Sequence, residues 1–246
     1  TDAGSVAGAN ALTAVKITTL PGAGALQDNG VNVTAGQFVS LADINAGKLV
    51  FTPAANANGA GYASFTFQVQ DDGGTANSGV DLDAAPRTMT VNVTSVNDAP
   101  VGTNNTVTTL EDTAYTFTAA DFGFTDPTDA ASVAGANALT AVKITTLPGT
   151  GTLQDNGVNV TAGQFVSLAD INSGKLVFTP AANANGAGYS AFTFQVEDDG
   201  GTANGGVDLD TSARTMTVDV TSVNDAPVGT SNTVTTLEDN AYTFSA

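Results

Sequence analysis

The stretch Phe-Thr-Phe-Gln-Val-Glu-Asp-Asp-Gly-Gly at residues 192–201 decides the fold class of this chain. Its apolar residues occupy every second position, so one face of an extended strand is apolar and the other carries Thr, Gln and Glu. The run ends in Asp-Asp-Gly-Gly, residue types that suit a tight turn. The same alternation recurs at Val142–Ile144, Tyr115–Ala119 and Met216–Val220. Each of these segments predicts a half-buried strand of an antiparallel sheet.

Helix signals are almost absent, because Thr, Val, Gly and Asn dominate and no long 3.6-residue apolar period appears. A short apolar run at Leu176–Thr179 predicts a further strand, and Val166–Ile171 predicts a single helical turn. Turn sequences at residues 155–157 and 172–174 separate these elements. Seven or eight short strands in about 125 residues are typical of a β-sandwich. The expected fold class is therefore all-β, with antiparallel β-sandwiches in tandem.

The tandem arrangement follows from an internal repeat. Sliding the sequence by 127 residues superposes it on itself, with 15 differences over 119 aligned positions. Val-Asn-Asp-Ala-Pro, at 96–100 and again at 223–227, is the natural boundary, since Pro breaks strand pairing and Asn-Asp favours turns. This predicts a repeat over 1–98 that lacks its opening strands, a complete repeat over 99–225, and the opening strands of a third over 226–246.

The composition excludes several classes of function. The 246 residues include no His, Cys or Trp, which removes thiol nucleophiles, imidazole bases, disulfides and sulfur-ligated metal sites. Six basic residues against 24 acidic ones give a net charge of −18, so no nucleic-acid partner is expected. No segment approaches 18 consecutive apolar residues, so no membrane insertion is expected.

An enzyme is not expected either. The chain holds 3 Glu residues, and its Asp pairs occur in turn sequences in every copy. The Ser and Lys residues form no nucleophile motif, so no catalytic residue is predicted. The acidic residues are instead mostly Asp, 21 of 24, and Asp suits turns and metal sites built from oxygen alone.

The order of several motifs resembles a known family. Val-Asn-Asp-Ala-Pro is followed by Leu110–Asp112, Phe124–Asp129, Leu168–Phe178 and Asp198–Gly201. This order resembles the cadherin-like tandem repeats of giant, calcium-dependent, secreted bacterial surface adhesins. The segment Leu168–Phe178 is also similar to repeats of chondroitin-sulfate-proteoglycan-type extracellular proteins. The resemblance covers the whole repeat and implies an Ig-like β-sandwich that lies outside the cell, at a bacterial surface.

The resemblance also implies Ca²⁺ as the cofactor, bound where successive repeats meet. Ca²⁺ takes 6–8 oxygen ligands, and clustered Asp side chains would repel each other without it. The Asp-Arg-Glu motif of animal cadherins has no match here, so one or two ions per junction are expected. The ligands implied by position are Asn97, Asp98, Asp126, Asp129 and Asp199 at one junction, Glu111, Asn224 and Asp225 at the next, and Asp2 and Asp72 above the first repeat.

Each of these motifs also has a plainer interpretation. Asp199 begins a sequence typical of a hairpin turn, Asn97-Asp98 is typical of a linker, and Glu111 fits the solvated end of a strand. Asp81–Asp83 and Asp208–Asp210 fit solvated loops better than metal loops.

Two classes of function remain open. In the first, the repeats are Ca²⁺-stiffened extenders or fibre-forming modules of a bacterial surface adhesin or filament. Near-identity of the copies favours this class, because a spacer needs only length and stiffness. In the second, the repeats themselves bind a glycan or a copy of the protein on another cell. An exposed apolar or aromatic patch would favour the second class.

The partner expected in either case is a neighbouring copy of the repeat. The last residues carry the strand sequences Thr233–Leu237 and Ala241–Phe244, which the repeat over 1–98 lacks. They are expected to complete the first repeat of a neighbouring chain, building a head-to-tail filament to which Glu238 supplies the missing junction Glu. Alternatively, Thr1 marks an internal cut, and each repeat of one longer covalent array is completed within the same chain.

Overall fold

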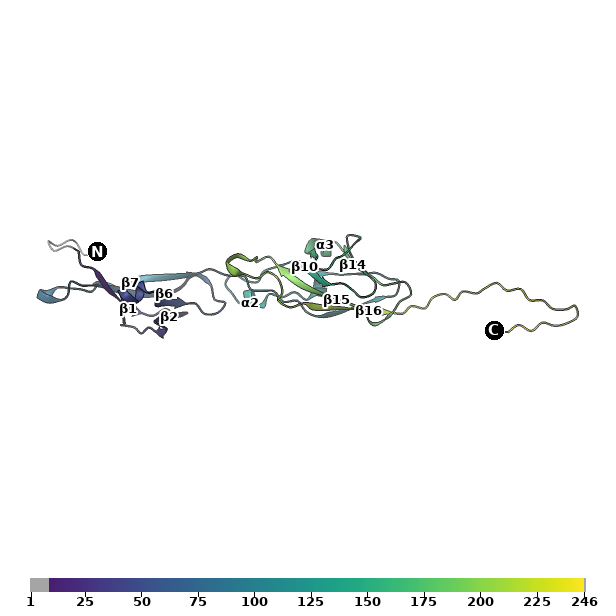
Figure 1. The fold of residues 1–246 in the computed structure, drawn as a ribbon, viewed down its shortest axis with the longest axis horizontal. Helices are drawn as coiled ribbons and strands as arrows, with labels where there is room; N and C mark the ends of the chain where they lie inside the picture. Colours follow the sequence, from purple (N-terminus) through teal and green to yellow (C-terminus); the bar gives the residue numbers. More distant parts are fainter. Residues whose placement is uncertain (1–8, 246) are drawn as a thin grey trace.

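Figure 1 shows two β-rich units in a row, followed by an extended tail. This computed structural model describes residues 9–245. We call residues 9–98 the first unit, 99–225 the second unit and 226–245 the tail. Each unit contains two sheets, so the expected all-β fold is confirmed. Among the described residues, no helix is long and apolar enough to cross a membrane.

The second unit is a sandwich of nine strands, more than expected because two of them have only two residues. One sheet has the spatial order β13 (Phe165–Ser167), β10 (Leu139–Thr146), β15 (Gly186–Asp198), β16 (Arg214–Thr221) and β8 (Asn105–Leu110). The other has the order β12 (Val158–Asn159), β11 (Thr152–Asp155), β14 (Leu176–Thr179) and β9 (Tyr115–Thr116). All strand pairs are antiparallel except that of β16 with β8, the last and first strands of the unit, which run parallel. The sequence pattern predicts only antiparallel pairs. The parallel pair was not predicted, because the alternation of apolar residues does not reveal strand direction.

The first unit repeats this arrangement without the two opening strands. One sheet has the order β4 (Phe38–Ser40), β1 (Leu12–Thr19), β6 (Gly59–Asp71) and β7 (Arg87–Val93). The other has the order β3 (Val31–Asn32), β2 (Ala25–Asp28) and β5 (Leu49–Thr52). Among the residues that the structure describes, no further strand pairs with β7 or β5, so both end their sheets.

Short helical turns connect the strands. The expected turn near residues 166–171 is α3 (Leu168–Asn172), capped by the Ser167 hydroxyl, which accepts a hydrogen bond from the Asp170 N–H at 3.1 Å. Its counterpart in the first unit is α1 (Leu41–Asn45), and α2 (Pro127–Ala130) follows the linker. The predicted strand over 115–119 is wrong beyond Thr116, because Thr118 caps the 3₁₀ turn η2 (Ala119–Phe122). Two further 3₁₀ turns are η1 (Ala76–Ser78) and η3 (Ala203–Gly205).

The core of the second unit lies between its two sheets. The alternation at residues 192–196 is confirmed, since Phe192, Phe194 and Val196 are 1%, 0% and 0% exposed. Phe117 follows β9 and inserts between the sheets, its ring 5.5 Å from that of Phe192 in an edge-to-face arrangement. The Phe122 ring likewise lies 4.9 Å from the Phe194 ring. We call residues 101–122 the opening segment of the second unit. It supplies aromatic side chains to the core as well as edge strands to both sheets.

The tail forms no strand, although its sequence predicts two. Residues 226–245 are all exposed, and they leave the second unit as a single extended segment (Figure 1). The strands expected at 233–237 and 241–244 are not formed in this structure, and their pairing with another unit stays a prediction. A strand needs a neighbour for its backbone groups, and among the described residues none lies beside the tail.

Candidate metal centre

Polar side chains from four segments meet where the linker enters the second unit. Asn97 and Asp98 belong to the linker, while Asp126 is the N-cap residue of α2 and Asp129 lies in its first turn. Pro127 fixes the first helical position, which explains why α2 begins here. The remaining members are Asn137, just before β10, and Asp198, the last residue of β15. We call these six residues the junction cluster.

Hydrogen bonds connect the linker to the second unit through this cluster. The Asn97 amide donates to Asp198 Oδ1 at 3.0 Å and to the Val207 carbonyl at 2.7 Å. The Asp98 N–H donates to Asp129 Oδ2 at 2.8 Å. The Asn137 side chain donates to Asn97 Oδ1, and the Asn137 backbone N–H donates to Asp126 Oδ2 at 2.7 Å. The linker is therefore packed against the second unit.

Three of the four carboxylates of the cluster are buried together. Asp126, Asp129 and Asp198 are 5%, 3% and 4% exposed. Burial raises the pKa of Asp129, and the nearby charges of Asp126 and Asp98 raise it further. Burial is also the main reason that the pKa of Asp198 is raised. The ion pairs found among residues 9–245 all lie elsewhere, so no Lys or Arg of the described part offsets this charge.

Two oxygens of the cluster have no hydrogen-bond donor. Asp126 Oδ1 and Asp198 Oδ2 are buried and unpartnered, which is costly for a carboxylate. In residues 9–245, no three carboxylates are placed so that they could hold a metal ion by themselves. A cation here needs amide or backbone oxygens in addition, and Asn97 and Asn137 carry such oxygens. Mixed carboxylate and carbonyl ligands fit Ca²⁺, and no softer metal is suited to them.

Asp199, the predicted ligand, points elsewhere. Successive side chains of a strand end lie on opposite sides, and Asp198 faces the cluster. Asp199 is exposed, and its Oδ1 accepts a hydrogen bond from the Ala138 N–H at 2.7 Å. Asp72 repeats this contact in the first unit with the Ala11 N–H at 2.8 Å. Each of these carboxylates therefore holds the start of a neighbouring strand, β10 for Asp199 and β1 for Asp72.

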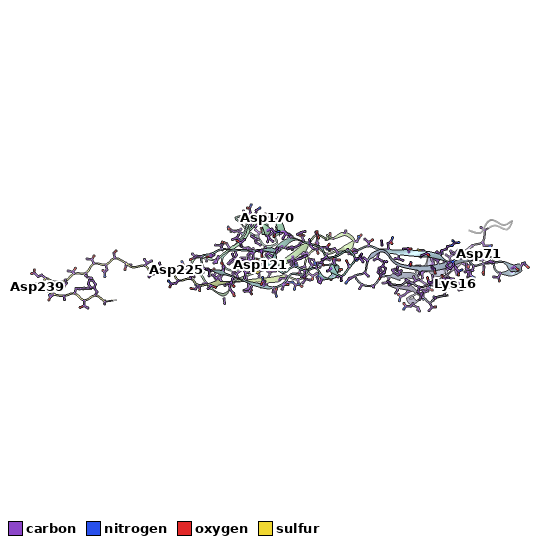
Figure 2. The ribbon with its side chains drawn as sticks, turned by 180° about the vertical axis from the view of Figure 1, so that it is seen from behind. Lys16, Asp71, Asp121, Asp170, Asp225 and Asp239 are labelled. Atoms are coloured by element: carbon purple, nitrogen blue, oxygen red, sulfur yellow. The ribbon has the colours of Figure 1, made fainter. Side chains whose placement is uncertain are left out.

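Glu111 lies at the opposite end of the second unit. It is 6% exposed, and its carboxylate accepts hydrogen bonds from the Asn185 side chain at 2.7 Å and from the Val223 N–H. The solvated strand end is therefore the wrong interpretation of Glu111, because the carboxylate is enclosed by the end of the sandwich. Asn224 and Asp225 come directly after Val223 in the chain and are exposed. Figure 2 shows Asp225 where the tail begins.

The remaining predicted ligands are Glu238 and Asp2. Glu238 is exposed in the tail, and Asp2 lies outside the described residues. Binding of Ca²⁺ by any of these residues stays a prediction.

Sequence reasoning missed three residues around the junction. Asn137 belongs to none of the motifs, and of the motif Asp198–Gly201 only Asp199 was expected to be a ligand. Asp210 is 1% exposed, so its predicted solvated loop is wrong. It accepts hydrogen bonds from the Gly102 N–H at 2.8 Å and from Arg214 Nε at 2.8 Å. An Arg four residues after an Asp was the available signal for this pair.

The negative charge of Asp210, unlike those of Asp129 and Asp198, is stabilised by its hydrogen-bond donors. Burial raises its pKa, but the hydrogen bonds from Arg214, Gly102 and Ser212 outweigh burial and hold the pKa below its usual range. Asp210 thereby anchors the opening segment to the body of the second unit through Gly102.

Comparison with known proteins agrees with this architecture. Residues 97–210 match a family model described as a bacterial Ig domain. Searches among curated proteins and among solved structures gave no match. The matched region starts at Asn97 of the junction cluster, ends at Asp210 and includes every strand of the second unit except β16. Residues 97–210, which make up most of the second unit, are therefore similar to a bacterial Ig domain.

Proposed function

We propose that this chain is a non-catalytic extracellular structural module, in which Ig-like units strung end to end are stiffened by Ca²⁺ at their junctions. Bacterial Ig domains are typically extracellular modules, and the family match supports that location. The end-to-end row of units in Figure 1 supports a role as a spacer in a surface adhesin or filament. The observation that carries the calcium is the pair of unpartnered buried oxygens, Asp126 Oδ1 and Asp198 Oδ2.

The junction cluster offers what a calcium ion requires. Asp126 and Asp198 would each turn a free oxygen toward it, and Asp129 and the amide oxygens of Asn97 and Asn137 would complete much of the shell. The ion would supply the positive charge that the cluster lacks. Because Asn97 belongs to the linker, binding would fix the linker to the second unit.

The first unit lies close enough to share the effect. A hollow at the junction is lined by Asn56 and Asn58 of the first unit, by the linker through Asp98, and by Asp129 of the second unit. Neutralising the carboxylates on one wall of this hollow would remove their repulsion. The two units would then hold a narrower range of angles to each other.

The proposal is tested with the double variant Asp126→Asn/Asp198→Asn, which keeps the shape and removes two charges. In chelator this variant should melt at a higher temperature than the unchanged chain, because buried carboxylate repulsion is relieved. In low-millimolar calcium the order should reverse, since the unchanged chain gains roughly 1–2 kcal/mol per site. Small-angle scattering should show a larger maximum dimension with calcium than with chelator.

Asp28→Asn serves as the control, because Asp28 ends β2 outside the junction cluster and its Oδ1 is likewise buried without a hydrogen-bond partner. It should leave the response to calcium unchanged. A melting temperature of the unchanged chain that is equal in calcium and chelator would refute the calcium site. An unchanged maximum dimension would refute the stiffening alone.

Glycan binding by the units is the weaker alternative. Within residues 9–225 the exposed aromatic rings that stand out are Phe38 and Phe165. A Lys ammonium lies over each ring, Lys16 at 5.6 Å and Lys143 at 5.4 Å from the centroid. The faces that would stack on a sugar are thus already covered.

A further inference from the structure

The connection from β15 to β16 begins with a loop that contacts the linker. This loop, residues 199–207, contains the 3₁₀ turn η3 and lies at the end of the second unit that adjoins the linker (Figure 1). The linker residue that it contacts is Asn97, which the loop and its neighbours surround on several sides. We call the surrounding residues the asparagine site: Asn137, Asp198, Gly200, Gly206 and Val207.

Asn97 pairs with Val207 through its side chain as well as through its backbone. The Asn97 carbonyl accepts a hydrogen bond from the Val207 N–H at 3.0 Å, and the Asn97 side-chain amide donates to the Val207 carbonyl at 2.7 Å. The same amide nitrogen donates to Asp198 Oδ1 at 3.0 Å, while Asn97 Oδ1 accepts from the Asn137 side chain. The site thus offers two acceptors and one donor, which an amide side chain can match. A carboxylate cannot, because it has no hydrogen to donate.

Two glycines leave the space that the Asn97 side chain occupies. A Cβ atom on Gly200 would lie 1.9 Å from Asn97 Oδ1 and 2.2 Å from Asn97 Cγ, closer than unbonded atoms can approach. A Cβ atom on Gly206 would lie 3.1 Å from Asn97 Cβ, which is also tight. Any larger residue at position 200 therefore has to displace the Asn97 side chain.

Space, and not backbone conformation, is the reason for a glycine at position 200. Gly200 is not among the residues with positive φ, so an L side chain is compatible with its backbone. The adjacent Gly201 is the opposite case, since its φ is 72° and nothing lies within 4 Å of the position of its Cβ. Gly201 therefore allows the turn, whereas Gly200 admits the linker.

The loop holds its shape through hydrogen bonds of its own. The Gly200 N–H donates to Asp198 Oδ1 at 3.0 Å, and the Gly206 N–H donates to the Ala203 carbonyl at 3.0 Å. The corresponding loop of the first unit contains the same two bonds, at 2.9 and 3.0 Å. The shape of the loop therefore recurs with its sequence, and the asparagine site is built largely by the second unit itself.

We propose that the second unit carries a binding site for an asparagine side chain of the linker, occupied here by Asn97, and that Gly200 determines this specificity. Pairing with Val207 at two points fixes which linker residue enters the unit. The bond to Asp198 fixes the orientation of its side chain. Each of these contacts is a hydrogen bond between protein groups, so the linker stays bound to the second unit in chelator. The site therefore does not rest on the proposed calcium.

Hydrogen exchange of single amides, followed by NMR on the whole chain in chelator, tests the site. The Val207 N–H is protected while the Asn97 carbonyl accepts its hydrogen bond. The Ile144 N–H, bonded to the Gln164 carbonyl at 2.9 Å, reports on the sandwich itself. Asn97→Asp keeps the size of the side chain but removes both donated bonds. Val207 should then exchange at least about 10-fold faster, as expected for the loss of one or two hydrogen bonds, while Ile144 is unchanged.

A double-mutant cycle in the same assay tests the role of Gly200. Gly200→Ala alone should speed the exchange of Val207 at least about 10-fold, because the added methyl group and the Asn97 amide compete for one space. Asn97→Ala removes that amide. Adding Gly200→Ala to Asn97→Ala should therefore change the exchange rate by less than about 3-fold. This difference separates a clash with Asn97 from damage to the loop.

Gly73→Ala is the matched control, because Gly73 occupies the same position in the loop of the first unit. The atoms nearest to its Cβ would belong to that unit, so Val207 should exchange as in the unchanged chain. Equal exchange of Val207 with Asn97 and with Asn97→Asp would overturn the proposed site. So would an equal acceleration at Ile144, since the whole sandwich would then open. An effect of Gly200→Ala that is the same with and without the Asn97 side chain would overturn the role of Gly200.

Discussion

Removing the Phe117 side chain should unfold the second unit at a much lower denaturant concentration. Phe117 is 0% exposed, and its ring lies 5.0 Å from Tyr115, 5.9 Å from Phe122 and 5.5 Å from Phe192. A buried Phe→Ala change costs about 3–5 kcal/mol, through lost burial and the cavity left behind. With a slope of ~2 kcal/mol per molar urea, a loss of ~4 kcal/mol lowers the urea midpoint by ~2 M. The assay is urea unfolding followed by far-ultraviolet circular dichroism at low protein concentration.

The repeat supplies the matched control. Phe244 is the same residue in the same sequence context, but it is 79% exposed. Phe244→Ala should change the free energy of unfolding by less than about 0.5 kcal/mol, as at most surface sites. If Phe117→Ala shifted the midpoint no more than Phe244→Ala, the opening segment would not close the core of the second unit.

Two further predictions use the same assay. Met216→Ala should cost about 2–5 kcal/mol, whereas Met89→Ala in the monomer should cost less than about 1 kcal/mol, because Met216 is buried and Met89 is half exposed; equal costs would mean that the first unit is closed. Asp210→Asn should lower the urea midpoint at pH 7, and the difference from the unchanged chain should shrink as the pH falls below about 4. The sign follows from the lowered pKa of Asp210: its stabilisation is present above the unfolded-state pKa and is lost as the pH falls through the folded one. A difference that grows toward acid would contradict this assignment.

Much of the fold could be predicted from the sequence, because alternation reports burial directly. The strands around residues 142–144, 192–197 and 216–220 all appear within longer observed strands. Alternation failed after Thr116, where a cap and a 3₁₀ turn place Phe117 and Phe122 in the core without a strand. It also could not reveal that β8 is parallel to β16, because the same face is buried in either direction. Nor could it show that the tail strands stay unformed, since a strand depends on its neighbour.

The junction cluster was predicted in part, for a different physical reason. The motif resemblance pointed to the linker and to the Asp residues around α2, and the structure does bring Asn97, Asp98, Asp126 and Asp129 together. It pointed to Asp199 where Asp198 faces the cluster, because one residue of strand register reverses the side. Asn137 is distant in sequence from the linker and belongs to no motif. Only the packing of β10 beside β15 brings it to Asp198.

The parallel pairing of β8 with β16 has a mechanical consequence. These are the first and last strands of the second unit, and they lie side by side over six residue pairs, from Asn105–Met216 to Leu110–Thr221. Tension along the array pulls the start of β8 one way and the end of β16 the other. The load then slides the strands past each other, so the backbone bonds between them must break together rather than one after another from an end.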